Sequence, residues 1–283
     1  MDIECVDFSV HPENQYFSEQ DGILYDKNKT TIVCAVETIT SVDIPDTVTT
    51  IGNLAFWKQN LQEISLHEGI ETIGTSAFAY SKIKEIVLPQ SLKNLGHSAF
   101  FSMAKLEKVV LPEKIIDIPA YSFENCINLK QITLPVSVNG ICMNAFKGTG
   151  LEEVVLPRNV NYIETDAFAT NTLKKVTFLG HPYDSYNMIK EDAFGNNTQL
   201  TIYAYAGAKG ERFAKELGLD LVVMLDWLEV SFVGDIVYNG QEQKPAFSSR
   251  YLPSDFKEGV DYTIVYKNNI EPGEATAEIT GIG

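Results

Sequence analysis

The sequence predicts an elongated repeat solenoid followed by a small all-β module, and three observations support this prediction. The dipeptide Ala-Phe, or Ser-Phe in one copy, recurs along the chain at steps of 22, 22, 23, 23, 22 and 26 residues. Apolar residues at relative positions 0, +3 and +5, often followed by Pro, repeat with the same period. Further apolar positions follow each copy in phase with these. Self-similarity at such a period is the signature of stacked coils.

The repeat columns can be read directly from the sequence. The Phe column consists of Phe56, Phe78, Phe100, Phe123, Phe146, Phe168 and Phe194. The 0 column consists of Ile39, Leu61, Ile83, Leu106, Leu129, Leu151 and Leu173, with Ile3 as a more distant copy. A later column consists of Ile51, Ile73, Leu95, Ile118, Ile141 and Ile163. Each coil is expected to hold a strand closed by Pro, a second extended stretch, and one or two helical turns around Ala-Phe. About eight such coils, stacked, merge the columns into one core.

The exposed +1 column alternates in sign from coil to coil. Its members are Lys84, Glu107, Lys130, Glu152 and Lys174. Neighbouring parallel strands lie about 4.8 Å apart, so these side chains are expected to pair along the stack. Pairing for register and solubility is the favoured interpretation, and a ligand-binding charge stripe is the alternative.

The two ends of the solenoid are expected to differ from the middle. Residues 21–33 predict a hairpin with its turn between Asp26 and Lys29. Residues 206–217 predict a helix that ends at Gly218 and caps the core. Residues 1–224 therefore form the predicted solenoid with its cap.

From residue 225 the period is lost. Alternating strands and turn residues, such as Asn239-Gly240 and Pro272-Gly273, predict a β-sandwich of immunoglobulin-like type over 225–283. The last strand is followed at once by the end of the sequence, so the module is expected to be partial. Residue 1 likewise lies only two positions before a repeat strand, and the chain is interpreted as a piece of a longer protein.

The composition excludes several functions. The formal net charge is −16 and the sequence pI is about 4.6, which argues against nucleic-acid binding and against docking on anionic membranes. No apolar run is long enough to span a bilayer, and the first residues do not form a signal peptide.

The sequence contains no motif that predicts chemistry. No C-x-x-C, G-x-S-x-G or Gly-rich phosphate loop occurs, and Asp26-Lys27-Asn28 lacks the Gly and Glu of a calcium loop. No catalytic, cofactor-binding or metal-ligating residue is therefore predicted. The four cysteines, Cys5, Cys34, Cys126 and Cys142, do not follow the coil period, and free thiols are favoured over disulfides.

The repeat, with LP after the strand, IG in the second stretch and AF in the turn, resembles the BspA-like leucine-rich repeats of bacterial surface proteins. FSVHPENQYFSEQDGILYDKNKTTIV and TIYAYAGAKGERFAKELG resemble the first and last repeats of that family, and the segment after residue 225 resembles a bacterial Ig-like module. The resemblance implies a leucine-rich-repeat solenoid on a protein that is displayed at the cell surface or secreted. It implies no enzyme activity, no cofactor and no membrane insertion.

The resulting functional hypothesis is a non-catalytic binding or adhesion protein that presents its repeat surface to a host matrix protein, a glycan or a neighbouring cell. The alternatives are an accessory or spacer domain of a larger surface enzyme, and a structural stalk. Two features are candidate ligand contacts. Trp57, Tyr80 and Phe101 are expected to form an exposed aromatic patch, with Trp57 and Phe101 two coils apart over small Ala79. His181, Tyr183 and Tyr186 lie in an inserted loop of the last repeat.

Overall fold

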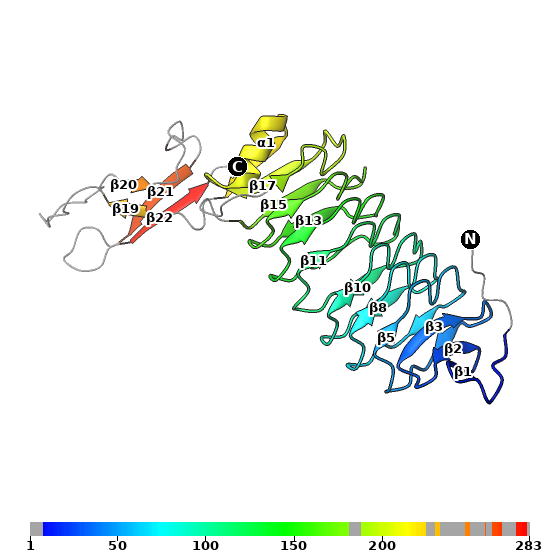
Figure 1. Ribbon diagram of the computed structural model, residues 1–283. Helices are drawn as coiled ribbons and strands as arrows, with labels where there is room; N and C mark the ends of the chain where they lie inside the picture. The colour runs from blue at the N-terminus through cyan, green and yellow to red at the C-terminus, as the bar shows by residue number, and fades with distance from the viewer. Residues whose placement is uncertain are drawn as a thin grey trace, which may run out of the picture. The chain divides into compact units, whose positions relative to one another are not determined.

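The computed structural model describes residues 8–180, 188–224, 230–232, 247–249, 258, 262–267 and 276–281. The chain divides into two compact units, Met1–Val176 with Tyr186–Leu200, and Thr177–Ser185 with Thr201–Gly283. The domain boundary that the sequence predicts after residue 224, between the solenoid and the β module, stays a prediction. The fold of the repeat region is a β-solenoid of about 8 turns with little helix, as predicted (Figure 1).

Six of the described coils contribute one short strand each to a first face. These strands are β4 (Ser41–Val42), β6 (Glu63–Ile64), β8 (Glu85–Val87), β10 (Lys108–Val110), β13 (Glu153–Leu156) and β15 (Lys175–Phe178). The pairs β4–β6 and β8–β10 are parallel and in register, for example Lys108 with Glu85. No strand forms over residues 131–134 in the described part of that coil, so this face is not one continuous sheet.

A second face is formed by the second extended stretch of each coil, which ends at the apolar column that runs from Ile51 to Ile163. Its strands are β5 (Thr50–Ile51), β7 (Thr72–Ile73), β9 (Asn94–Leu95), β11 (Asp117–Ile118), β12 (Gly140–Ile141), β14 (Tyr162–Ile163) and β16 (Met188–Ile189). All neighbours pair in parallel, but the sheet is interrupted between β9 and β11. The residue after the column normally donates its N–H to the preceding coil, as Gly96 does to the Ile73 carbonyl at 2.8 Å. Pro119 occupies that position after β11 and has no N–H to donate.

The Phe column forms the centre of the core. Successive rings from Phe56 to Phe194 stack with centroids 5.1–5.8 Å apart and planes within 12° of each other. Six of the seven side chains are fully buried, and Phe194 is 3% exposed. The predicted merging of the columns into one core is confirmed.

The segments around Ala-Phe are turns, and the predicted helical turns were wrong. The backbone N–H groups there bond to the next coil: Phe56 to the Ala77 carbonyl at 2.7 Å, and Phe78 to the Ala99 carbonyl at 2.9 Å. A helix needs those N–H groups for its own carbonyls. Residues two before or two after the Phe, such as Leu54 (φ 61°) and Lys58 (φ 57°), are also left-handed, which a right-handed helix cannot accommodate.

The N-terminal hairpin is confirmed. Strands β1 (Phe17–Gln20), β2 (Ile23–Asp26) and β3 (Thr31–Ala35) are antiparallel, and β3 then pairs in parallel with β5. The Asp26 carboxylate accepts hydrogen bonds from the Thr30 and Thr31 N–H groups at 2.6 and 2.7 Å. Although burial alone would raise the pKa of Asp26, these bonds lower it below its ordinary value. The carboxylate therefore holds the turn together.

In the second unit, the predicted helix is present as α1 (Lys209–Leu217), which ends at Gly218 in the left-handed conformation. It packs beside β17 (Thr201–Tyr205) and β18 (Asp220–Met224), which pair in parallel. Further along, β19 (Val230–Phe232) pairs with β20 (Phe247–Ser249), and β21 (Tyr262–Lys267) with β22 (Thr276–Gly281), both antiparallel. These described strands form two separate two-stranded sheets, and they do not show the predicted sandwich.

Candidate binding site

The turns of two neighbouring coils place Trp57 and Tyr80 side by side. Trp57 follows the core residue Phe56 directly, and Tyr80 stands two positions after Phe78. Five coils have a left-handed residue two positions after the Phe: Lys58, Tyr80, Ser102, Asn125 and Gly148. In the last repeat the left-handed residue is Gly195, one position after Phe194. Tyr80 is the largest of these residues, and φ 64° is unfavourable for a bulky side chain. Because neighbouring coils also hold left-handed residues at this position, φ 64° at Tyr80 belongs to the repeat turn.

The three aromatic side chains predicted to form a patch do meet. The ring of Tyr80 lies between the other two, 6.4 Å from Trp57 at 86° and 5.4 Å from Phe101 at 71°. Tyr80 is 43% exposed, while Trp57 and Phe101 are half-buried. Ala79, which was expected to separate Trp57 from Phe101, is buried instead, and Tyr80 fills the space between them. We call Trp57, Tyr80 and Phe101 the aromatic patch.

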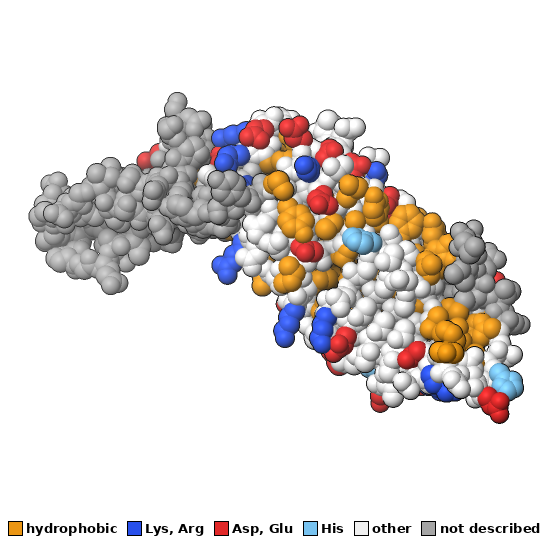
Figure 2. All heavy atoms as spheres, in the orientation of Figure 1, with side chains coloured by type: hydrophobic (Ala, Val, Ile, Leu, Met, Phe, Trp, Pro, Cys, Tyr) orange, Lys and Arg blue, Asp and Glu red, His pale blue; other side chains and the backbone are white. Residues whose placement is uncertain are grey.

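A cation borders the aromatic patch. The Lys58 ammonium lies 4.0 Å from the centroid of Trp57 and 6.0 Å from that of Tyr80. This cation–π contact holds one positive charge against the rings on a strongly acidic chain. Hydrophobic side chains gather in several groups on the visible face of the solenoid (Figure 2).

The predicted charge pairing occurs in a different column. The +1 residues form no ion pair with one another in the described coils. The pairs join the +2 residues, Glu85 with Lys108 at 3.8 Å and Glu153 with Lys175 at 3.9 Å. Glu85 and Lys108 are register partners on adjacent strands, whereas the +1 residues precede those strands.

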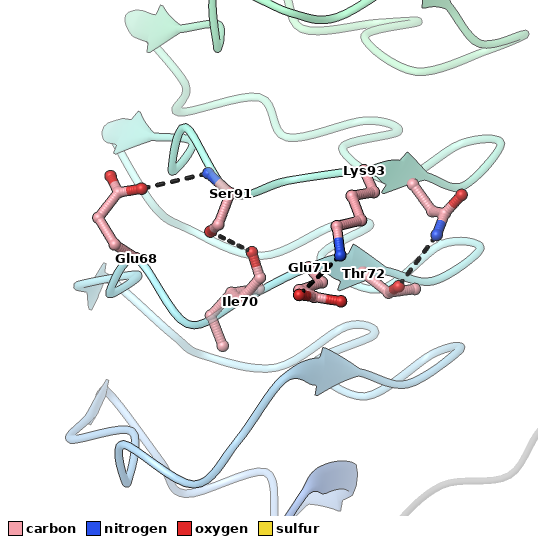
Figure 3. A network of polar contacts seen from close by, with 7 residues as sticks. Glu68, Ile70, Glu71, Thr72, Ser91 and Lys93 are labelled. Carbon is pink, nitrogen blue, oxygen red and sulfur yellow. Dashed lines mark hydrogen bonds and ion pairs between the residues drawn. The ribbon is translucent and has the colours of Figure 1, made fainter.

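Polar contacts on the second face have a structural role. The Lys93 ammonium pairs with Glu71 of the preceding coil at 2.8 Å, and the Ser91 hydroxyl donates to the Ile70 carbonyl at 2.6 Å (Figure 3). Glu68 accepts the Ser91 N–H at 3.2 Å. His67 is similar, since its ring accepts the Gly69 N–H at 3.0 Å and lies 3.2 Å from the Pro45 carbonyl. These groups bind neighbouring coils to each other and are not free for a ligand.

The cysteines differ from the prediction at one position. Cys34 is disulfide-bonded, so the expectation of free thiols was wrong there. Cys126 and Cys142 are free. Burial raises the pKa of Cys126 to about 12, and its thiol donates to the Phe100 carbonyl at 3.1 Å. Burial, with Glu164 and Asp117 nearby, also raises the pKa of Cys142. Both thiols are therefore poor nucleophiles.

The remaining points concern the inserted loop, metal binding and membrane spans. His181, Tyr183 and Tyr186 lie outside the described residues, so the loop stays a prediction. Among the described residues, no group of three or more His, Cys, Asp or Glu side chains could hold a metal ion. In the same part of the chain, no helix is long and apolar enough to cross a membrane. Sequence reasoning did not find the interruption of the second face at Pro119, although a Pro at a position that otherwise needs an N–H was a usable signal.

The repeats match a known family. The BspA type leucine rich repeat region, in 6 copies, matches residues 33–139 and 96–207, which together cover more than half of the chain. The chain belongs to the BspA-type leucine-rich repeat family. No curated protein matches this BspA-type chain.

Solved structures share the BspA-type solenoid. A leucine-rich repeat protein from Eubacterium ventriosum is 25% identical, with a TM-score of 0.59, and the match covers 68% of this chain and 52% of that one. The pneumococcal vaccine antigen PcpA is 20% identical, with a TM-score of 0.54, covering 77% and 50%. A leucine-rich repeat protein from T. pallidum is 19% identical, with a TM-score of 0.50, covering 76% and 98%. The chain thus spans about half the length of the first two.

Proposed function

We propose that this chain is part of an exported, non-catalytic binding protein that attaches to a partner protein through the aromatic patch. The observation that carries the proposal is the contact of three aromatic side chains, in which the exposed ring of Tyr80 lies between Trp57 and Phe101. Trp and Tyr are enriched where protein interfaces are strongest, and exposed aromatic clusters mark contact sites. The family supports a binding role for the repeat surface.

A protein partner fits the patch better than a glycan. The three rings stand edge to face at 86° and 71°, so they do not offer one flat platform for a sugar ring. An uneven aromatic surface bordered by the Lys58 ammonium suits the side chains of a protein interface, where edge-to-face aromatic contacts are favourable.

The disulfide supports export to the cell surface or the medium. Disulfides persist in oxidising compartments and are rare in the cytosol, and Cys34 is disulfide-bonded. The acidic net charge of −16 keeps such a chain soluble and away from anionic surfaces.

The second unit fits a spacer that holds the solenoid away from its attachment. The antiparallel pairs β19–β20 and β21–β22 support the proposal of an Ig-like module over 225–283. In the competing hypothesis of an accessory or spacer domain of a larger surface enzyme, the whole chain would be a spacer and the aromatic patch would bind nothing.

The test is surface plasmon resonance of the chain against immobilised extracellular-matrix proteins, with a glycan array beside it. The variant Tyr80→Asn places a residue tolerant of φ > 0 at this position, as Asn125 does in a later coil, so the turn is kept while the ring is lost. The matched control is Tyr16→Asn, because Tyr16 is 74% exposed and lies outside the patch.

We expect saturable binding to a matrix protein. Tyr80→Asn should weaken this binding about tenfold or more, which corresponds to a loss of roughly 1.4 kcal/mol or more at a central contact. Tyr16→Asn should leave the binding unchanged. Binding that both variants leave unchanged would place the site elsewhere. Binding only on the glycan array would replace the protein partner by a sugar, and no binding on either surface would favour the spacer hypothesis.

A further inference from the structure

The three coils that carry the aromatic patch have turns whose charge is opposite to that of the whole chain. The chain has a formal net charge of −16. The turn segments of these coils, residues 52–60, 74–82 and 96–105, contain no Asp or Glu. Their lysines, which we call the basic cluster, are Lys58, Lys82 and Lys105. Later coils place carboxylates in the same segment, as at Glu124 and Asp166.

All three members of the basic cluster are exposed and adjoin the aromatic patch. The Lys58 ammonium lies 4.0 Å from the ring centroid of Trp57 and 6.0 Å from that of Tyr80. Lys82 follows Tyr80 by two residues, so their Cα atoms are at most about 7.6 Å apart. Lys105 occupies the equivalent position in the next coil, directly before the residue of the 0 column.

The positive charges of the basic cluster are not paired with carboxylates in the described part of the chain. None of the ion pairs found there includes a member of the cluster. On the turn of a later coil, by contrast, the Lys147 ammonium pairs with Asp166 at 2.7 Å. On the first face, Glu85 pairs with Lys108 at 3.8 Å. The ammonium groups beside the aromatic patch are therefore available to a carboxylate of another molecule.

The local charge outweighs the net charge for a group that contacts the patch. The Debye length is about 8 Å at physiological ionic strength, so carboxylates on distant coils are largely screened. Glu124 is the first carboxylate on the turns beyond Phe101, and its backbone carbonyl accepts the Ser102 N–H of the neighbouring coil at 2.7 Å. The turn surface is thus positive at the Trp57 end of the patch and negative beyond Phe101.

We propose that the aromatic patch and the basic cluster together bind an acidic segment of the partner protein. An apolar side chain of that segment packs on the rings, and a neighbouring Asp or Glu pairs with Lys58. The cation–π contact with Trp57 holds the Lys58 ammonium in place for this carboxylate. Lys82 and Lys105 add attraction at longer range. The inference rests on the proposed function, because it names the chemistry of the partner at the same site.

The test is isothermal titration calorimetry of the whole chain with synthetic linear peptides that carry a central Leu or Phe flanked by Glu, Gln or Lys. Saturable binding of the Glu peptides is expected. The Gln peptides should bind about tenfold more weakly, and the Lys peptides more weakly still. Raising the salt concentration should weaken binding of the Glu peptides more than that of the Gln peptides.

Variants at position 58 separate the charge from the turn. Lys58→Asn removes the ammonium and keeps a residue that tolerates the left-handed turn, as Asn125 does at the same position of a later coil. It should weaken the Glu peptides about tenfold and leave the Gln peptides nearly unchanged. Lys58→Arg keeps the charge and the cation–π contact and should retain binding. The matched control is Lys130→Asn, which changes the net charge equally at an exposed position outside the patch.

Equal affinity for the three kinds of peptide, or an effect of Lys58→Asn no larger than that of Lys130→Asn, would overturn the acidic partner. Absence of saturable peptide binding would overturn it as well. The proposed function fails by a different result, since it requires attachment to a matrix protein that Tyr80→Asn weakens, whatever the peptides do. Binding of heparin that Lys58→Asn weakens, without binding of the Glu peptides, would assign the basic cluster to a sulfated glycan instead.

Discussion

The phenol ring of Tyr162 lies over Gly140, its register partner in the preceding coil. A methyl group at position 140 would overlap Cζ and Oη of Tyr162. Glycine at this position therefore lets Tyr162 reach past one coil towards Asp117. Gly140→Ala is expected to destabilise the chain by about 1–3 kcal/mol, because the ring must leave its place. Thermal unfolding measures this change.

The control for that prediction is Tyr162→Ala. In this background the added methyl group meets no ring, so Gly140→Ala should cost much less than in the unaltered chain. Equal costs in both backgrounds would contradict the contact.

Phe100 and Phe101 are neighbours with opposite roles. Phe100 is fully buried and stacks 5.8 and 5.2 Å from Phe78 and Phe123. Phe100→Ala is expected to lower the free energy of unfolding by about 3–5 kcal/mol, since a large cavity forms in the core. Phe101→Ala, on the half-buried patch, should cost under about 1 kcal/mol. Denaturant unfolding of the two variants compares them, and a small effect at Phe100 would contradict the stacked core.

The Cys126 thiol makes stability depend on alkaline pH. Its pKa is raised from 9.0 to about 12 in the folded chain because it is buried. Above pH 9 the unfolded chain releases this proton while the folded chain keeps it, so stability falls as the pH rises from about 9 towards 12. Cys126→Ala removes that contribution. Urea unfolding between pH 8 and pH 11 should show a steeper loss in the unaltered chain, and parallel curves would contradict the burial.

The disulfide at Cys34 predicts a chemical cross-link near the first coil. Cys126 and Cys142 are free, so Cys5 is the remaining cysteine of the chain. Non-reducing peptide mapping is expected to find the Cys34 peptide in a cross-linked species that reduction separates. Reduction should lower the free energy of unfolding by about 2–4 kcal/mol through the unfolded state. Detection of Cys34 as a free thiol in non-reduced protein would contradict this prediction.

The features that depend on the repeat period and on local turn residues could be predicted from the sequence. The Phe column from Phe56 to Phe194 was predicted from its spacing and is the stacked core. The N-terminal hairpin and α1 were predicted from turn residues and from Gly218. The Ala-Phe segment was predicted as helical because its residues favour helix, but hydrogen bonds between coils outweigh that local preference.

The candidate site could be predicted only in part. The sequence columns brought Trp57, Tyr80 and Phe101 together correctly, since coils stack in phase. The sequence columns could not show that the ring of Tyr80 lies between Trp57 and Phe101. The direction of the Tyr80 side chain follows from the left-handed conformation of its own backbone, which the columns do not contain. The +2 ion pairs were missed for a related reason, since two adjacent exposed columns cannot be told apart without the strand boundaries.

The sequence by itself determined that this protein is a stack of coils, because one apolar face per repeat can be buried only against the next repeat. Tertiary structure decided at which junction the sheet of the second face is interrupted. Pro119 removes one donor, but the loss of the bonds from Ile116 and Asp117 and the burial of Asp117 Oδ1 depend on how two whole coils sit against each other. Hydrogen bonds between coils join residues about 20 positions apart in the sequence, and their presence follows from the packing of the stack.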